Sequence, residues 1–181
     1  MCAVVGVCGH KEAAKFSRDG LHTMQHRGQD SVGVAVSDSR DPAVIKHRKG
    51  LGVAMHVFPA GGEAINSLVG DCAIGHDRYA TAGEPDLLCA QPHVTTCPPL
   101  AFACNGDIPP AGYEQARCDL LARASDVELK TRNDGELEAN FLAVELRSGK
   151  SVPEAVKALM QTFKGAYSAV FLYQGRLYAF R

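Results

Sequence analysis

Hydrophobic residues gather into short runs in the first part of the chain and into helical stripes in the second. Residues 3–8 (AVVGVC) form a short apolar run rich in valine, which predicts a buried β-strand. Two later runs, joined by the polar segment DSRD, predict a pair of strands connected by a turn. The strands expected after the first are 32–37, 42–48, 72–80 and 99–106.

Helical spacing is clearest in three segments. Residues 11–25 carry apolar side chains at roughly helical intervals. Residues 133–149 combine an acidic first turn, an apolar stripe and a Ser-Gly end, and 151–163 begin with a serine and a proline in the first turn. Residues 165–180 return to strand character around a Gln-Gly turn.

The order of these elements, strands first, then helices, then strands again, is typical of a layered α+β protein with antiparallel sheets. It differs from the regular alternation of a βαβ arrangement, and the chain has neither a GxGxxG nor a Walker motif. We expect one domain over residues 1–181, a length that can bury a substantial core.

Composition narrows the class without defining a function. Net charge is −1, 46% of residues are hydrophobic, and no block of like charge suggests binding to nucleic acid or a membrane surface. No apolar run approaches the roughly 18 residues of a membrane helix, and the N-terminus is unlike a secretory signal, so we expect a cytoplasmic protein. The seven cysteines are odd in number and lack a CxxC pair. This predicts reduced, mostly buried thiols, with neither a disulfide framework nor a metal site.

A cysteine directly after the initiator methionine is the first candidate for chemistry. Removal of Met1 would expose the α-amine of Cys2, which titrates near about 8, close to a thiol at about 8.5. The amine could then act as the base for its own thiol, which is the principle of N-terminal nucleophile enzymes. The alternative is a small residue that happens to begin a strand.

Four further segments contain candidate site residues, each with a simpler structural explanation. In QHRGQDSVG (25–33) the glycines suit a loop close to a substrate or to the first strand, or merely a glycine-capped turn. Arg78 at a strand end could bind a carboxylate or lie on the surface. The pair Asn105-Gly106 could form an oxyanion hole or only a turn. Asp134 could receive an ammonium group or only cap a helix.

Taken in order, these segments resemble the class II (N-terminal nucleophile) glutamine amidotransferases. The resemblance covers essentially the whole chain, and QHRGQDS in particular is most like the amidophosphoribosyltransferases of purine synthesis. The matching segments are Cys2, QHRGQDSVG, GHDRYATAG, AQP, CNGDI, NDGE and GAYS, with support from KGLG and HVF.

This resemblance implies a four-layer αββα sandwich of antiparallel sheets. It also implies that the glutamine side-chain amide is hydrolysed through a γ-glutamyl thioester on Cys2, with no cofactor. The ammonia would pass to a synthase or phosphoribosyltransferase domain or subunit, because this chain has no phosphoribosyl pyrophosphate loop.

Site residues follow from the same resemblance. Arg78 would pair with the α-carboxylate of L-glutamine and Asp134 with its α-ammonium, while Asn105 and Gly106 would form the oxyanion hole. The remaining residues of the glutamine pocket would be Arg27 and Thr81.

The chain departs from the family pattern at several positions. Ala3 stands where a glycine is usual, and Cys104 where a histidine is usual. Asn133 and Gly135 replace two serines, and the sequence stops before the family's Asp-Pro and Arg-Pro-Leu segment, which leaves open whether the last strands of the sandwich are present. Two other functions therefore stay open: a domain that binds glutamine or a partner without turnover, and a hydrolase of another amide.

Overall fold

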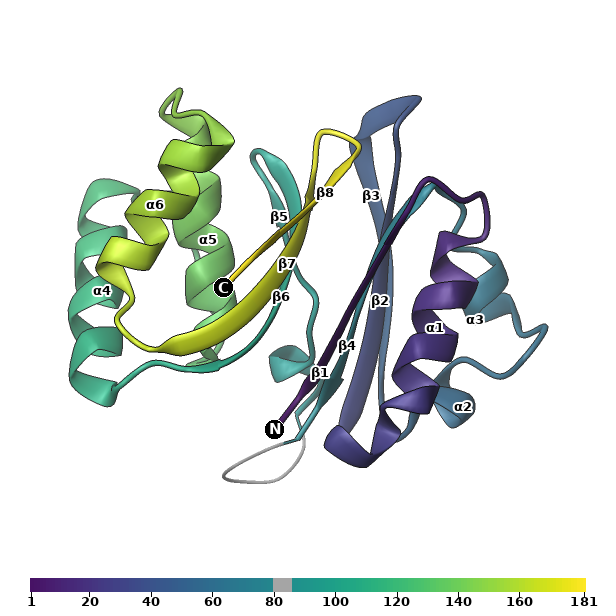
Figure 1. Ribbon diagram of the computed structural model, residues 1–181. Helices are drawn as coiled ribbons and strands as arrows, with labels where there is room; N and C mark the ends of the chain where they lie inside the picture. The colour runs from purple at the N-terminus through teal and green to yellow at the C-terminus, as the bar shows by residue number, and fades with distance from the viewer. Residues whose placement is uncertain (80–85) are drawn as a thin grey trace.

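Two four-stranded antiparallel sheets lie face to face with helices on their outer sides (Figure 1). The computed structural model describes residues 1–79 and 86–181, and the structural statements below concern these residues. The four layers are helix, sheet, sheet and helix, which confirms the predicted αββα class.

The first sheet carries the N-terminus on an edge strand. Its order is β1 (Ala3–Cys8), β4 (Cys72–Arg78), β2 (Ser31–Asp38) and β3 (Asp41–Leu51). Its outer face is covered by α1 (Ala13–Thr23), α2 (Ala54–Val57) and α3 (Glu63–Asn66), and α1 is followed by the 3₁₀ turn η1 (Gln25–Arg27).

The second sheet carries the C-terminal hairpin. Its order is β5 (His93–Thr96), β6 (Pro99–Asp107), β7 (Ala166–Tyr173) and β8 (Arg176–Phe180). The helices on its outer side are α4 (Pro110–Arg123), α5 (Asp134–Arg147) and α6 (Val152–Thr162), and the 3₁₀ turn η2 (Leu87–Cys89) precedes β5.

Local sequence explains several of these boundaries. Ser151 and Glu154 form a capping box at the start of α6, which satisfies backbone N–H groups in its first turn. The β7–β8 hairpin turns at Gln174 and Gly175, both with positive φ (49° and 68°), the conformation that two-residue hairpin turns require. The predicted helix within 151–163 and the two predicted strands within 165–180 are confirmed. The predicted helices within 11–25 and 133–149 are confirmed as well.

Small residues allow the two sheets to approach closely. The layer between them contains a buried cluster dominated by alanines from β2 and β6, together with Ile74 and Leu172. Larger side chains fill the two outer layers, where α1 packs on the first sheet and α4, α5 and α6 pack on the second. Side chains on the facing surfaces of the two sheets are therefore close enough to contact the opposite sheet.

Several features differ from the sequence predictions, among them the short helices α2 and α3, which were not predicted. Strand β1 is an edge strand with alternating exposure, and Ala3 is its one fully buried residue. Helix α4 and strand β5 were not predicted, because α4 buries only Tyr113, Ala116 and Leu120 and β5 has only four residues, two of them threonines.

Over the described residues, no helix has both the length and the apolar character needed to cross a membrane.

The prediction of reduced, mostly buried cysteines is wrong in two respects. Cys8 and Cys72 are bonded as a disulfide, because they lie directly opposite each other in the β1–β4 register. Their separation of 64 residues gives no local sign of this pairing. Of the seven cysteines, Cys72 and Cys104 are buried, whereas Cys97 and Cys118 are exposed.

Gly33 on β2 should not tolerate a side chain. A Cβ there would overlap the backbone carbonyl oxygen of Gln91 and crowd the Lys49 side chain, and neither β2 nor the Gln91 segment can move easily inside the sandwich. We expect Gly33→Ala to lower the free energy of unfolding by about 3 kcal/mol or more. Denaturant unfolding followed by circular dichroism measures this change.

Gly112 in α4 is a matched control for the same substitution. Its Cβ would meet only the Ile108 side chain at 3.8 Å, an ordinary van der Waals contact. Gly112→Ala should therefore raise stability by about 0.5–1 kcal/mol, because alanine favours a helix interior. Equal effects of the two substitutions would contradict the packing described for Gly33.

Candidate active site

Cys2 meets the end of β6 across the space between the two sheets. It lies directly before β1, and its backbone N–H donates to Asn105 Oδ1 at 2.9 Å. Cys2 belongs to the first sheet and Asn105 to the second, so the two predicted site residues come together only because the sheets stack.

Two other segments hold Cys2. The guanidinium Nε of Arg27 donates to the Cys2 carbonyl oxygen at 3.1 Å. The backbone N–H of Tyr79 donates to Cys2 Sγ at 3.5 Å, and Sγ lies 4.0 Å from the Tyr79 carbonyl oxygen. The thiol is half-buried and unbonded, so it remains available for reaction.

The segment QHRGQDSVG contains several glycines and charged residues, and the contacts of the loop after η1 explain why they occur there. Gly28 lies so close to β4 that a Cβ there would be 2.7 Å from the Asp77 carbonyl oxygen. The Asp30 N–H donates to the Arg78 carbonyl oxygen at 3.1 Å. Together with the bond from Arg27 to Cys2, these contacts tie the loop to both the Cys2 strand and the Arg78 strand.

Asn105 and Gly106 lie near the end of β6, in register with β7. A Cβ at Gly106 would overlap the side chain of Tyr167, so glycine permits the close pairing of the two strands here. Because Asn105 Oδ1 accepts the bond from Cys2, its Nδ2 is the atom left to donate. A side-chain amide N–H beside a backbone N–H is the arrangement that can stabilise an oxyanion.

Asp134 is the first residue of α5 and is fixed against the end of β6. Its Oδ2 accepts a hydrogen bond from the Ile108 N–H at 3.0 Å. Burial raises its pKa above the usual range, and the neighbouring Asp107 adds to this, while the Ile108 N–H opposes it. An ammonium group next to Asp134 would therefore relieve an unfavourable buried charge.

Arg78 is the last residue of β4 and is half-buried. Within residues 1–79 and 86–181, no carboxylate forms an ion pair with its guanidinium. Burial, the Lys49 charge and, more weakly, the Arg78 charge lower the pKa of His93 to about 3, although its contact with Asn133 opposes this. The His93 ring lies 3.0 Å from Oδ1 of Asn133, the residue that caps α5.

The remaining predicted positions have varied outcomes. Thr81 lies outside the described residues. Ala3 is accommodated, because its methyl group is buried among core side chains while its backbone pairs with Asp77. Asn133 caps α5 by accepting from the Gly135 N–H at 3.0 Å, which serves in place of a serine there.

Sequence reasoning assigned no role to three buried polar residues behind Asn105. Burial raises the pKa of Glu138 to about 8, although its contact with the Cys104 thiol opposes this. His76 and Gln91 contact the backbone of Cys104. The strand pattern could have indicated that His76 is buried. It lies at every second position of β4 together with Cys72 and Ile74, so the three side chains face the same buried layer.

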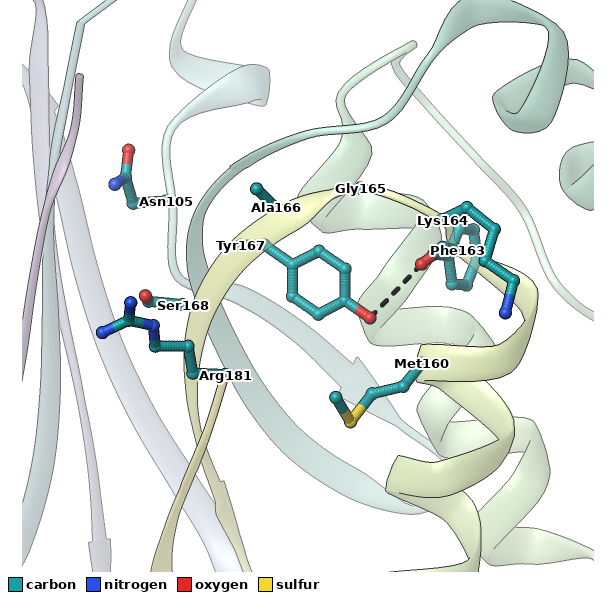
Figure 2. A pocket seen from close by; sticks show the side chains of 9 residues that line it. All are labelled: Asn105, Met160, Phe163, Lys164, Gly165, Ala166, Tyr167, Ser168 and Arg181. Carbon is teal, nitrogen blue, oxygen red and sulfur yellow. Dashed lines mark hydrogen bonds between the residues drawn. The ribbon is translucent and has the colours of Figure 1, made fainter.

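A pocket of about 470 Å³ opens beside Asn105, a volume within the range of small-molecule sites. In Figure 2, Asn105, Ser168 and Arg181 lie along one side of it, and the Tyr167 hydroxyl donates to the Phe163 carbonyl oxygen at 3.4 Å. Asn105 therefore both contacts Cys2 and lines this space. The lining is completed by Met160, Lys164, Gly165 and Ala166.

In the described part of the chain, no three metal-ligating side chains come together as a metal site would require. The features that the structure does assemble are a half-buried cysteine, an amide-bearing side chain and a charged residue at the start of α5.

Solved structures match this fold and define its class. One, described as the allosteric regulatory enzyme of purine biosynthesis, superposes with a TM-score of 0.80 at 30% identity, covering 96% of this chain and 36% of the other. The glutamine phosphoribosylpyrophosphate amidotransferase of B. subtilis superposes with a TM-score of 0.76 at 29% identity, covering 96% and 35%. The αββα sandwich is thus that of N-terminal nucleophile amidotransferases.

This chain belongs to the class II glutamine amidotransferase family. The glutamine–fructose-6-phosphate aminotransferase of Shouchella clausii is 35% identical over 172 residues, 95% of this chain and 27% of the relative. Amidophosphoribosyltransferase 3, chloroplastic, of Arabidopsis thaliana is 34% identical over 182 residues, 99% and 32%. No protein-family model matches the chain. The chain spans between a quarter and a third of the length of these relatives.

Proposed function

We propose that this domain hydrolyses the side-chain amide of L-glutamine to glutamate and ammonia, with Cys2 as nucleophile. The observation that carries the proposal is the bond from Cys2 N to Asn105 Oδ1, which joins a candidate nucleophile and a candidate oxyanion donor. Met1 is 76% exposed, so its removal would meet no packing obstacle, and the same nitrogen would become the α-amine.

The first half of the reaction forms a thioester. The Cys2 amine takes the thiol proton, and the sulfur attacks the amide carbon of glutamine. The developing oxyanion receives hydrogen bonds from Asn105 Nδ2 and the Gly106 N–H. The carbon–nitrogen bond then breaks, and the proton held by the amine passes to the leaving nitrogen, which departs as ammonia.

The second half restores the enzyme. Water gives a proton to the free amine and attacks the thioester carbon, and the same oxyanion donors stabilise the second tetrahedral intermediate. The carbon–sulfur bond breaks, glutamate leaves, and the proton returns to the thiolate. No metal or redox step is needed.

Two charged side chains would select a free amino acid. Arg78 makes no ion pair among the described residues, and so can form a bidentate pair with an α-carboxylate. Asp134 is held by the Ile108 N–H in a buried setting that favours a nearby ammonium. Arg27, which holds the Cys2 carbonyl, and Thr81 would complete the glutamine pocket.

The ammonia acceptor is proposed from resemblance alone. Relatives that act on fructose 6-phosphate and amidophosphoribosyltransferases match at nearly equal identity, 35% and 34%. The QHRGQDS segment favours phosphoribosyl pyrophosphate, the acceptor used in purine synthesis, which a phosphoribosyltransferase domain or subunit would bind. Ammonia transfer to phosphoribosyl pyrophosphate, compared with fructose 6-phosphate, in the presence of the acceptor protein would test this choice.

Removing either substrate charge partner should weaken glutamine binding more than it slows chemistry. We expect Arg78→Leu to raise KM for glutamine about 100-fold, because a charge-assisted bidentate pair contributes roughly 3 kcal/mol. Asp134→Asn should act in the same direction while keeping an oxygen for the Ile108 N–H. Steady-state kinetics with an ammonia-coupled assay measures both changes.

Control variants separate this effect from general electrostatics. Asp107→Asn removes an equal charge next to the same strand end, and Arg48→Leu removes an exposed arginine from β3. Both should leave KM within about threefold of wild type. If Arg78→Leu and Asp134→Asn behave like these controls, the proposed amino-acid pocket is wrong.

Ammonia release from purified protein tests the function itself. Glutamine should be hydrolysed, whereas asparagine and N-acetylglutamine, which lacks the α-ammonium, should be poor substrates. Glutamine binding without ammonia release would support the alternative of a binding domain and contradict the proposal. Faster hydrolysis of N-acetylglutamine or a simple amide would indicate a hydrolase of another class.

A further inference from the structure

On the side of β6 that faces away from β7, the peptide groups of Cys104, the residue before Asn105, meet side chains rather than a strand. Strand β5 pairs with β6 only as far as His93 opposite Phe102. The next residue, Pro92, has no N–H to continue the ladder. The part of β6 that carries Asn105 would therefore be unsupported on this side without other partners.

Gln91 replaces the missing strand on one side of Cys104. Its Oε1 accepts from the Cys104 N–H at 2.7 Å, and its Nε2 lies 3.9 Å from Cys104 Sγ. The Gln91 side chain is itself held, because it is 95% buried and packs closely against Gly135 at the start of α5.

His76 supports the carbonyl of Cys104 from the other sheet. Its Nε2 lies 3.1 Å from the Cys104 oxygen, and the fully buried ring is neutral because burial lowers its pKa to about 3. A carbonyl oxygen can only accept, so the ring carries its proton on Nε2. This is a hydrogen bond between the two sheets.

These contacts close a ring that contains both the nucleophile and the oxyanion donor. In the β1–β4 register His76 lies opposite Val4, two residues from Cys2. From His76 the ring continues to Cys104, its neighbour Asn105, and then back to Cys2 N at 2.9 Å. Opening the ring at His76 would leave a buried carbonyl without a partner and allow the sheets to shift.

We propose that His76 and Gln91 are positioning residues: by holding the peptide groups of Cys104 they fix Asn105 opposite Cys2. The proposal rests on the proposed hydrolysis of glutamine by Cys2. Neither side chain touches the reacting atoms, and their effect is the distance and angle between the thiol and the oxyanion donors. A displacement of about 1 Å at such a site can lower a rate about 100-fold.

Variants at the two positions test the proposal. His76→Leu and Gln91→Met remove the hydrogen bonds at similar volume and should lower kcat about 10- to 100-fold, with KM within about threefold. His76→Gln keeps an N–H donor at similar reach and should recover most of kcat. Ile74→Val, two residues away on the same buried face of β4, is the matched packing control and should leave kcat within about threefold.

A second readout does not depend on turnover. In ¹⁵N-labelled protein, the side-chain amide signals of Asn105 are identified by their loss in Asn105→Asp. They should shift or broaden in His76→Leu and Gln91→Met, and remain in place in Ile74→Val. If His76→Leu does not fold, Gln91→Met and His76→Gln carry the test.

The outcomes separate the two claims. Wild-type protein that releases no ammonia contradicts the proposed function, whereas the Asn105 signals still test the positioning. Folded His76→Leu and Gln91→Met proteins with kcat within threefold of wild type, or with Asn105 signals like those of Ile74→Val, overturn the positioning role. An equal loss in His76→Gln and His76→Leu would also overturn it, because the retained donor should matter.

Discussion

Replacing Cys2 with serine should abolish glutamine hydrolysis, with a fall in kcat of at least about 10⁴-fold. A serine hydroxyl is a far weaker acid than a thiol, so an α-amine that titrates near about 8 produces far less of the attacking anion from it. Cys2 is half-buried, and among the described residues its sulfur is within hydrogen-bond reach of the Tyr79 backbone, so the folded state should be almost unchanged. Ammonia release and thermal unfolding of the same preparation measure the two effects.

Cys89 provides the matched control for that experiment. It is also an unbonded, half-buried cysteine, but it lies in η2 rather than at the N-terminus. Cys89→Ser should retain activity within about twofold of wild type. Activity of Cys2→Ala, which has no nucleophilic side chain, within tenfold of wild type would show that another group is the nucleophile.

Asn105 is expected to have the second largest effect. Asn105→Ala should lower kcat by about 10²–10³-fold, equivalent to roughly 3–4 kcal/mol of transition-state stabilisation, with little change in KM. The reason is that Nδ2 is the free donor of a side chain whose Oδ1 is already engaged with Cys2. Steady-state kinetics on glutamine measures the split between kcat and KM.

Asn105→Asp distinguishes two roles of the same side chain. It keeps an oxygen to accept from Cys2 N but replaces the Nδ2 donor with a second, negatively charged oxygen. Stabilisation of an oxyanion then predicts a loss at least as large as that of Asn105→Ala. An active Asn105→Asp protein would mean that the side chain only holds the cysteine, and the assigned oxyanion hole would be wrong.

Much of the fold could be predicted from periodicity, because the strongest patterns coincide with local energetics. Helix α5 combines an Asn133 cap with a broad buried face, and the β7–β8 hairpin contains the turn residues that its geometry needs. Helix α4 was missed because only three of its 14 residues are buried, one of them an alanine. Its position depends on packing against the second sheet, which its own sequence does not show.

The candidate site was predicted residue by residue from ordered motifs, but its supporting contacts were not. The pairing of Cys2 with Asn105 spans 103 residues and two sheets. The contact of His76 with Cys104 and the disulfide between Cys8 and Cys72 depend likewise on stacking and register. Such contacts follow from tertiary structure, so the local pattern of a single sequence cannot reveal them.

The most direct test of the central claim is intact-mass analysis after incubation with 6-diazo-5-oxo-L-norleucine, a glutamine analogue that alkylates an active-site thiol. We expect a chain that has lost Met1 and gained one adduct on its N-terminal peptide. The mass of this adduct should equal that of the reagent less dinitrogen. The adduct should be absent in Cys2→Ser and present in Cys89→Ser. Retention of Met1, or an adduct at any cysteine other than Cys2, would contradict the N-terminal nucleophile mechanism.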